Sequence, residues 1–484
     1  MPKEKQEQDE AQEMPPDGSI TDTRMETQDA VFGEIQADGP NYRDVGWLGT
    51  TVLMMKTQIG LGVLSMPAAF DALGIVPGVL CLTAIGALTT WSNHMIGVFK
   101  LRHNEVYGID DVGFLIFGTP GRVTLGSAFV LWYIFSAGSG MLGISIGLNA
   151  VSSHGACTAI FALVAATIAF GLGSIQTLGQ IAWIAWIGLV CILTAILTVA
   201  VAVGIQDNPP GVPDGAVWAS DYKVIGNPSF AGAIAALTTM VFAYAGTPAF
   251  FAIVSEMRQP LYYTRSLIIC QTIVSAFYFA IGIVVYYFCG SYVASPALGS
   301  AGPLVKKISY GFALPGLLAS TMLFVHVSPA LGYSTALYRK RSTHTTQLPA
   351  KYLFVRIFQG SRHLTANTTT HWLSWFGITF GITLIAYIIA STIPIFNDLV
   401  SLIGALLGTL MCFQPMGAMW LYDNWAERKV NKTLKWKLMV LWSVFVIVSG
   451  TFLMVGGTYG SVVNIVSEYS GGSKAFSCAD NSSP

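Results

Sequence analysis

The chain alternates long apolar runs with short polar breaks. From Val45 onward the runs are long and continuous, whereas a membrane β-barrel would show short segments of alternating polarity. A helix needs about 20 apolar residues to cross the hydrocarbon core of a bilayer. We therefore predict an all-α polytopic membrane protein with eleven spans, near residues 46–70, 73–98, 122–150, 158–176, 179–204, 229–254, 266–289, 310–336, 371–391, 397–420 and 437–458.

The composition supports this class and excludes others. The 484 residues are 53% hydrophobic and 10% charged, whereas a soluble domain carries roughly 25% charged residues. Soluble enzymes and disordered scaffolds are excluded by this comparison. Lys plus Arg and Asp plus Glu number 25 each, so no basic excess points to nucleic acid. The seven cysteines show no spacing typical of a metal site, and we expect none.

An acidic segment precedes the first span. Residues 1–43 hold eleven Asp or Glu against four Lys or Arg, with few apolar residues. Such a segment cannot bury enough apolar surface to fold. We predict a disordered cytosolic tail. The tail is either only solvated or is a binding segment for cytosolic regulators.

Basic residues predict the orientation of the spans, because Lys and Arg gather in cytosolic loops. With the acidic tail in the cytosol, the inside loops carry sixteen Lys or Arg and the outside loops and tail carry four. An odd number of spans then places the C-terminus outside the cell. On that oxidising side Cys157 and Cys478 are candidates for a disulfide, and Asn481 begins an N-x-S/T sequon that is a candidate for glycosylation. The alternative to the disulfide is two free thiols, and the alternative to glycosylation is a sequon that is not used.

Two spans are interrupted by glycine and proline near their middle. Residues 58–67 of the first span read QIGLGVLSMP, and residues 244–251 of the sixth read YAGTPAFF. Glycine tolerates non-helical dihedral angles, and proline removes a donor and clashes with the preceding turn. Lipid cannot satisfy the freed backbone groups, so such breaks persist only against protein or a water-filled cavity.

The two breaks occupy matching places in the chain. Gly60 and Gly246 lie 186 residues apart, and each break opens a set of five spans. This predicts a five-plus-five inverted repeat over residues 44–204 and 229–420, followed by an eleventh span (437–458) and a tail (459–484). Paired broken helices in corresponding positions indicate the substrate site of a transporter. A packing kink is the alternative for each break taken alone.

Such a site suits a zwitterion. Backbone N–H groups at the start of a half-helix bind a carboxylate, and free carbonyls at the other break accept from an ammonium. Neither charge needs a charged side chain, which fits the nearly uncharged spans. In helical register Tyr244, Thr247 and Phe251 share a face and would surround an apolar or aromatic substrate side chain.

Four stretches carry a family resemblance. The first-span sequence GLGVLSMPAA (60–69) resembles the opening of the amino acid/auxin permease family, within the LeuT-fold superfamily. The lead-in GPNYRDVGW (39–47) is similar to that of the fungal neutral amino acid permeases, the N amino acid transport system type. SEM (255–257) and IPIFNDLVSLIGA (393–405) are also family-like, and the resemblance runs from about residue 31 to 458.

The resemblance implies a LeuT-like fold with eleven spans. It also implies import of neutral aliphatic and aromatic amino acids at the plasma membrane by proton symport, with no cofactor beyond the coupling proton. The family's carboxylate-binding stretch falls on Ile59–Ser65, and its amine-binding carbonyls fall around Tyr244–Thr247. We therefore nominate ten substrate-binding residues: Ile59, Gly60, Leu61, Gly62, Ser65, Tyr244, Ala245, Gly246, Thr247 and Phe251.

Ionisable groups inside spans are costly and therefore functional candidates. Lys56 precedes the first break by one turn and is positioned to occupy the place of a sodium ion in related transporters; snorkelling toward the cytosol is its alternative. His326 in the eighth span has a pKa suited to proton relay, or it is a structural histidine. Glu256 and Asp398 lie near membrane edges and are candidates for gates or caps.

Three other functions compete with plasma-membrane import. The first alternative is an amino-acid sensor that signals through the tail or the basic 337–370 loop. The second is a vacuolar exporter of the same family, and the third is an intramembrane serine protease. The protease hypothesis rests on the hydrolase-like motif GISIG (143–147) around Ser145, with His326 or His154 as base. That motif requires a strand, a sharp turn and a helix, whereas here it lies among small residues that let helices approach closely. We therefore expect a transporter and not an enzyme.

Overall fold

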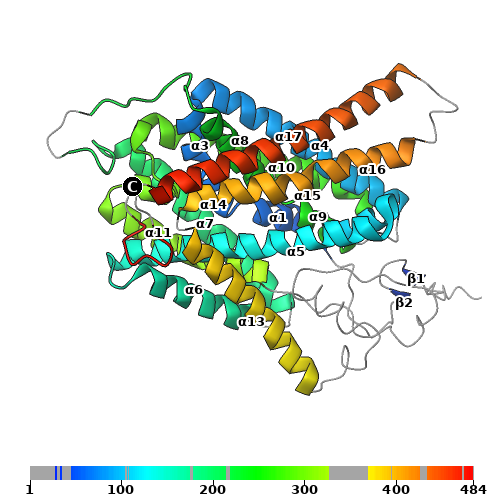
Figure 1. Cartoon of the computed structure of the whole chain (residues 1–484), viewed down its shortest axis with the longest axis horizontal. Helices are drawn as coiled ribbons and strands as arrows, with labels where there is room; N and C mark the ends of the chain where they lie inside the picture. Colours follow the sequence, from blue (N-terminus) through cyan, green and yellow to red (C-terminus); the bar gives the residue numbers. More distant parts are fainter. Residues whose placement is uncertain are drawn as a thin grey trace, which may run out of the picture.

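The long helices of the chain lie side by side in one bundle (Figure 1). The computed structural model describes residues 45–103, 106, 108–174, 178–213, 218–325, 369–393, 395–425, 433–470 and 474–482, and the pairs 28–29 and 33–34. Each pair forms a two-residue strand, β1 (Gln28–Asp29) and β2 (Gly33–Glu34), and the two run antiparallel. Apart from these strands, the predicted acidic tail lies outside the described residues.

Nine helical segments of the described chain are long and apolar enough to cross a membrane. They are α4 (Ile75–Arg102), α5 (Ile109–Ser152), α7 (Leu178–Ile205), α8 with α9 (Phe230–Tyr244 and Thr247–Ser255), α10 (Tyr263–Cys289), α11 (Pro303–Val325), α13 (Thr369–Thr392), α14 to α16 (Phe396–Ile403, Thr409–Cys412 and Gln414–Asn424) and α17 (Leu434–Ser470).

Two further segments complete the bundle. The first span is divided among α1 (Trp47–Gln58), α2 (Leu61–Leu64) and α3 (Met66–Leu73). The fourth span is the shorter apolar helix α6 (Thr158–Gly173). Together with the nine longer segments they give the eleven spans that the hydrophobic pattern predicts.

Three predicted boundaries differ from the helix ends by seven residues or more, and one of them is the start of the eighth span, where α11 begins at Pro303 instead of residue 310. The third span begins at Ile109 instead of residue 122, because Asp111 and Arg122 are both buried and form an ion pair at 3.6 Å. The chain bends within this segment at Gly118, whose φ of 68° lies in the left-handed region that glycine adopts readily. The eleventh span, α17, continues to Ser470 instead of ending at residue 458.

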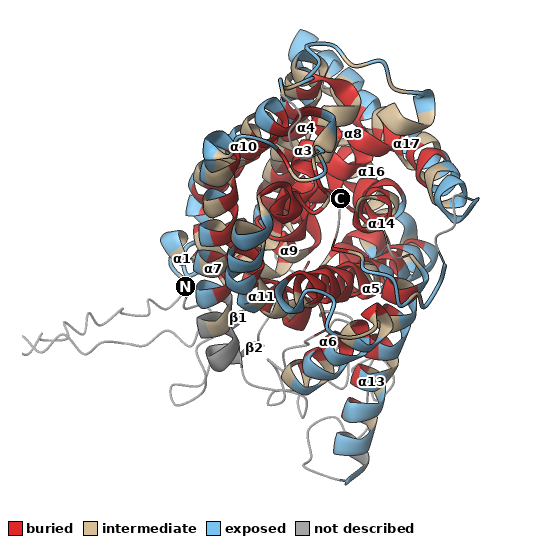
Figure 2. Cartoon of the chain, turned by 90° about the vertical axis from the view of Figure 1, so that its left-hand side faces the viewer, coloured by how far each residue is buried: buried red, intermediate tan, exposed pale blue. Residues whose placement is uncertain are grey.

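The surface of the bundle is apolar around its circumference. Figure 2 looks along the helices from the end that carries the C-terminus, with buried residues facing inward and exposed residues facing outward. The exposed side chains of α7 and α17 include Val201, 61% exposed, and Phe452, 56% exposed. Soluble monomers rarely expose apolar surface on this scale. The chain is therefore a multi-pass membrane protein.

The helices pack as two interlocking groups. In one group α5, α6, α11 and α13 contact one another. In the other, the helices of the broken spans, α1 to α3 and α8 to α9, contact α4 and α10. Helix α7 touches both groups, and α17 lies against α8. The interruptions of the first and sixth spans thus lie within the same group.

Candidate functional site

The first and sixth spans are interrupted at the predicted glycines. Helix α1 ends at Gln58 and α2 begins at Leu61, so Ile59 and Gly60 form the first break. Helix α8 ends at Tyr244 and α9 begins at Thr247, so Ala245 and Gly246 form the second. In the first break both Ile59 and Gly60 leave the helical region, with ψ values of 96° and −115°. In the second break Ala245 does so, with ψ at 52°, whereas Gly246 keeps helical angles.

The two breaks face each other. The Gln58 Nε2 amide donates a hydrogen bond to the Tyr244 carbonyl oxygen at 3.1 Å. A Cβ added to Gly62 would lie 2.4 Å from Ala243 Cα, and one added to Gly246 would lie 2.6 Å from Thr57 Oγ1. Contacts this close exist only because glycine has no side chain. Breaks 186 residues apart in the chain thus form one buried site.

Three nominated residues on the helices that follow the breaks are buried. The Ser65 side chain is fully buried, and its hydroxyl has no hydrogen-bond partner among the described residues. Thr247, at the first position of α9, is also fully buried. Phe251, one turn further along α9, is 1% exposed. Ser65 therefore carries an available buried donor at the junction of α2 and α3, five residues beyond Gly60.

Tyr244 does not share a face with Thr247 and Phe251. Its hydroxyl is hydrogen-bonded to Ser275 Oγ of α10 at 2.8 Å. The prediction extended one helical register across residues 244–251, but the helix stops at Tyr244 and restarts at Thr247. The interruption that creates the site also ends the register, so this part of the prediction is wrong.

Two carbonyls at the end of α8, one of them in the predicted stretch Tyr244–Thr247, already have donors. The Tyr244 carbonyl accepts from Gly246 N at 2.8 Å as well as from Gln58. The Ala243 carbonyl accepts from the hydroxyl of Tyr278, a residue of α10 that sequence reasoning missed. Tyr278 is one of several tyrosines in an apolar span, and nothing in the pattern distinguishes it.

Lys56 connects the first break to the other group of helices. Its ammonium donates to Ser320 Oγ of α11 at 2.7 Å, and the residue is 5% exposed. A Cβ added to Gly60 would lie 3.4 Å from the same Ser320 oxygen. The lysine therefore points inward beside the break and does not snorkel to a membrane edge. His326, the second candidate for proton coupling, lies outside the described residues.

The two gate candidates lie at helix ends. Glu256 follows the last residue of α9, and its carbonyl accepts from Val45 N at 3.3 Å, where the chain enters the first span. Lys100 of α4 donates to the Phe251 carbonyl of α9 at 3.2 Å, which places a positive charge at the negative end of that helix. Asp398 is buried in the first turn of α14.

The C-terminal segment 474–482 crosses the end of the bundle that Figure 2 faces. A disulfide joins Cys478 to Cys157, the pair nominated from the sequence. Phe476 N donates to the Ser391 carbonyl at the end of α13 at 2.9 Å. The segment therefore attaches to the group of helices that contains α6 and α13.

Asn481 points into the bundle. Its Oδ1 accepts from Asn149 Nδ2 at 2.7 Å, and its Nδ2 lies 3.4 Å from Ser145 Oγ. In this arrangement the nitrogen that a glycan would modify is engaged with α5, which argues against Asn481 as a glycosylated surface residue. Ser145 itself donates to Leu142 O at 2.9 Å inside α5, so the strand and sharp turn of a hydrolase nucleophile are absent there.

Asp480 adds electrostatic contacts to the same segment. Burial raises the pKa of this carboxyl, but hydrogen bonds from Ser482 and the charges of Lys306 and His154 outweigh burial and hold the pKa below its ordinary value. The Lys306 ammonium also donates to the Ser482 carbonyl. Together with the disulfide, these contacts fix the segment against α5, α6 and α11.

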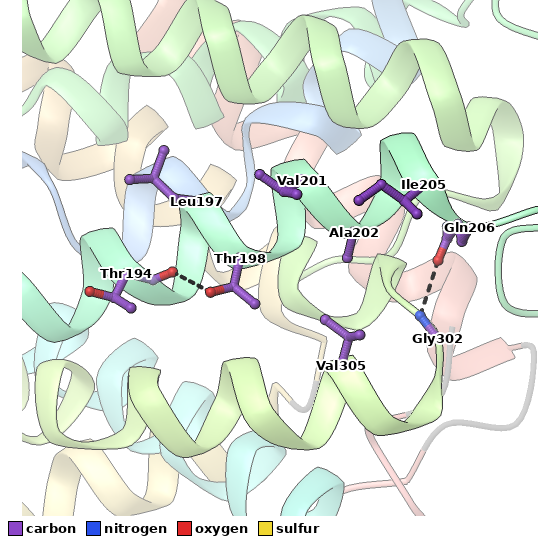
Figure 3. A pocket seen from close by; sticks show the side chains of 9 residues that line it. All are labelled: Thr194, Leu197, Thr198, Val201, Ala202, Ile205, Gln206, Gly302 and Val305. Atoms are coloured by element: carbon purple, nitrogen blue, oxygen red, sulfur yellow. Dashed lines mark hydrogen bonds between the residues drawn. The ribbon is translucent and has the colours of Figure 1, made fainter.

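A cavity at the surface of α7 is separate from the two breaks. It has a volume of about 750 Å³ and is lined by residues of α7, Gly302 and Val305. Figure 3 shows apolar side chains along its wall, with the Gln206 amide oxygen accepting from Gly302 N at 3.1 Å at one end. Leu197 and Val201 in its wall are at least half exposed. This groove therefore belongs to the apolar circumference of the bundle and not to the site.

Eleven spans with paired broken helices define a membrane transporter. The chain belongs to the transmembrane amino acid transporter protein family, whose model matches residues 43–463. A transmembrane transporter of Gibberella moniliformis is 33% identical over 96% of this chain and 94% of its own length. The N amino acid transport system protein of Neurospora crassa is 33% identical over 92% of this chain and 91% of its own length.

A solved structure supports the fold. The structure of MHP1, a nucleobase-cation-symport-1 family transporter in a closed conformation with bromovinylhydantoin bound, covers 90% of this chain and 95% of its own. The TM-score is 0.50 at 13% sequence identity. The likeness shows that the chain shares the overall fold of this transporter structure. The predicted inverted repeat over residues 44–204 and 229–420 stays a prediction.

Proposed function

We propose that the chain imports neutral aliphatic and aromatic amino acids by proton symport, with alternating access around its two broken helices. The meeting of the two breaks in one buried site carries this proposal. Discontinuous helices expose backbone amides and carbonyls at mid-membrane depth, where a transported molecule replaces the missing intrahelical partners. Membership of an amino acid transporter family supports the amino acid as that molecule.

The chemistry around the breaks favours a neutral amino acid. The amides that begin α2 and the unpartnered hydroxyl of Ser65 suit the substrate carboxylate. A Cβ added to Gly143 of α5 would lie 3.5 to 3.8 Å from side-chain carbons of Leu61, Leu317 and Phe396, so apolar side chains gather where α5 meets α2. A charged substrate side chain would lose its hydration against these apolar groups without a compensating partner. The Neurospora relative is named an N amino acid transport system protein, which supports an amino acid as the substrate.

Lys56 is the proposed proton carrier. Its ammonium bonds to Ser320 and so joins α1 to α11, which belong to different groups of helices. Loss of the proton would remove the charge and one donor from this link. Protonation of Lys56 would then change which relative position of the two groups of helices is favoured. A proton gradient across the membrane would drive this change in one direction. His326 is kept as a second proposed carrier.

The proposal is tested with purified protein in sealed liposomes. Labelled phenylalanine or leucine is supplied outside, and an inward proton gradient is imposed in sodium-free buffer. We expect concentrative uptake that a protonophore abolishes. Uptake that needs sodium, or that ignores the protonophore, would contradict proton symport.

Two other outcomes would favour other functions. Binding without gradient-driven uptake by correctly folded protein would favour the sensor. Localisation of the tagged protein to the vacuole, with export from it, would favour the vacuolar exporter. We propose the plasma membrane, with the N-terminus in the cytosol and the C-terminus outside. The disulfide at the C-terminal end supports this orientation, because disulfides persist on the oxidising side of the membrane.

A further inference from the structure

The first halves of both broken helices end at one point inside the molecule. Helix α1 ends at Gln58 and α8 ends at Tyr244, and the Gln58 amide bonds to the Tyr244 carbonyl. The last carbonyls of a helix lack intrahelical donors, and the helix dipole places partial negative charge on them. Two such ends that converge within a membrane-spanning bundle need donors from another element, since lipid supplies none.

Tyr278 of α10 is that donor. Its hydroxyl lies 2.9 Å from the Gln58 carbonyl oxygen and 2.7 Å from the Ala243 carbonyl oxygen. The side chain is fully buried, and its ring packs edge-on against Tyr244 with 5.0 Å between ring centres. One hydroxyl group therefore reaches the C-terminal end of each half-helix from a third element.

We propose that Tyr278 is a positioning residue for substrate binding, and that its hydroxyl holds the two half-helix ends at the separation the amino acid requires. The hydroxyl has a single hydrogen and two carbonyl acceptors within hydrogen-bond distance. It can stay bonded to one half-helix while the other tilts. The backbone that follows each end, residues 59–62 and 245–247, is displaced when this tie is lost.

This inference rests on the amino acid transport of the family and not on proton coupling. A binding measurement at equilibrium, without a gradient, tests it separately from the proposed symport. Tyr278→Phe removes only the hydroxyl and keeps the ring in place. Tyr263→Phe is the matched control: Tyr263 also lies on α10, is 1% exposed, and donates to the Asn93 carbonyl of α4 at 2.9 Å, away from both breaks.

The experiment measures the Kd of labelled phenylalanine for each purified full-length variant and the KM and maximal rate of its uptake in liposomes. We expect Tyr278→Phe to raise both Kd and KM about tenfold, because two buried carbonyls lose the one donor hydrogen that they share. Its melting temperature without substrate should match that of Tyr263→Phe. The control should keep Kd and KM within about twofold of the wild-type values, since its bond lies outside the site.

Three results would overturn the positioning role. The first is an unchanged Kd in Tyr278→Phe, and the second is an equal rise in both variants. The third is a Tyr278→Phe protein that fails to fold while Tyr263→Phe folds, because the hydroxyl would then act on stability alone. If wild-type protein does not bind phenylalanine, the neutral substrate class fails, and the same comparison is made with the amino acid that the wild-type protein binds.

Discussion

A single methyl group at Gly62 tests whether the contact between the two breaks is required for transport. Alanine at this position would place Cβ 2.4 Å from Ala243 Cα and 2.7 Å from Ala243 Cβ. Carbon atoms pack at about 3.5 Å or more. One of the two half-helices must therefore move by more than about 1 Å, and the obstacle is backbone, which cannot rotate away as a side chain can.

The cost of this movement sets the expected effect. Overpacking a close contact costs about 1–3 kcal/mol, which corresponds to a change of about fivefold to about 150-fold in an equilibrium. The higher helix propensity of alanine offsets at most about 1 kcal/mol. Because the displaced backbone is the proposed binding surface, we expect the initial rate of uptake by Gly62→Ala to fall at least about tenfold.

The assay compares Gly62→Ala with Gly311→Ala in liposomes that contain equal amounts of folded protein. A Cβ added at Gly311 of α11 meets no atom within 4 Å, so this control introduces the same methyl group without a clash. Gly311→Ala should transport at the wild-type rate. Wild-type uptake by Gly62→Ala would refute the reasoning, because the two breaks would then tolerate separation.

Four further predictions follow from other contacts. Lys56→Met should abolish uptake driven by a proton gradient while exchange of labelled for unlabelled substrate continues; gradient-driven uptake at the wild-type rate would remove Lys56 from the coupling. Ser65→Ala should raise the KM about tenfold, because a buried donor beside the carboxylate is lost; an unchanged KM would argue against this contact. Cys478→Ser should lower the thermal midpoint, since a disulfide contributes about 2–4 kcal/mol. Reductant should lower the thermal midpoint of the wild-type protein but not that of the variant. A wild-type thermal midpoint that reductant does not change would contradict this. The pKa of Asp480 is lowered from its ordinary value of 3.8, so the stability that this carboxylate contributes is complete above pH 3.8 and is lost as the pH falls through the lowered pKa. Asp480→Asn should therefore remove part of the acid sensitivity of the thermal midpoint. Identical pH profiles for the variant and the wild-type protein would contradict the assignment.

The spans and the two breaks were predictable because their signals are local. A continuous run of about 20 apolar residues crosses a bilayer as an α-helix. The glycine and proline of residues 58–67 and 244–251 interrupt the helix in the turn in which they occur. The start of the third span was missed for the opposite reason. Asp111 and Arg122 look like loop residues until the fold pairs them.

The side chains that complete the site were not predictable, because their partners are distant in the chain. Tyr278 bonds to Gln58, 220 residues earlier, and Lys56 bonds to Ser320, 264 residues later. Lys56 was nominated because an ionisable group inside a span is costly and this one precedes the first break by one turn, but its partner Ser320 was not anticipated. The direction of the Tyr244 side chain was predicted wrongly, because the helical register was extended through the interruption between α8 and α9.

The disulfide makes most of the chain a covalent ring. Cys157 and Cys478 are separated by 321 residues, so the ring encloses every span from the fourth to the eleventh and leaves the first three as an open arm. A single proteolytic cut within the ring would not release a fragment: both pieces would migrate together on a gel until reductant is added. The ring closes six residues before the C-terminus, where Asn481 already contacts α5.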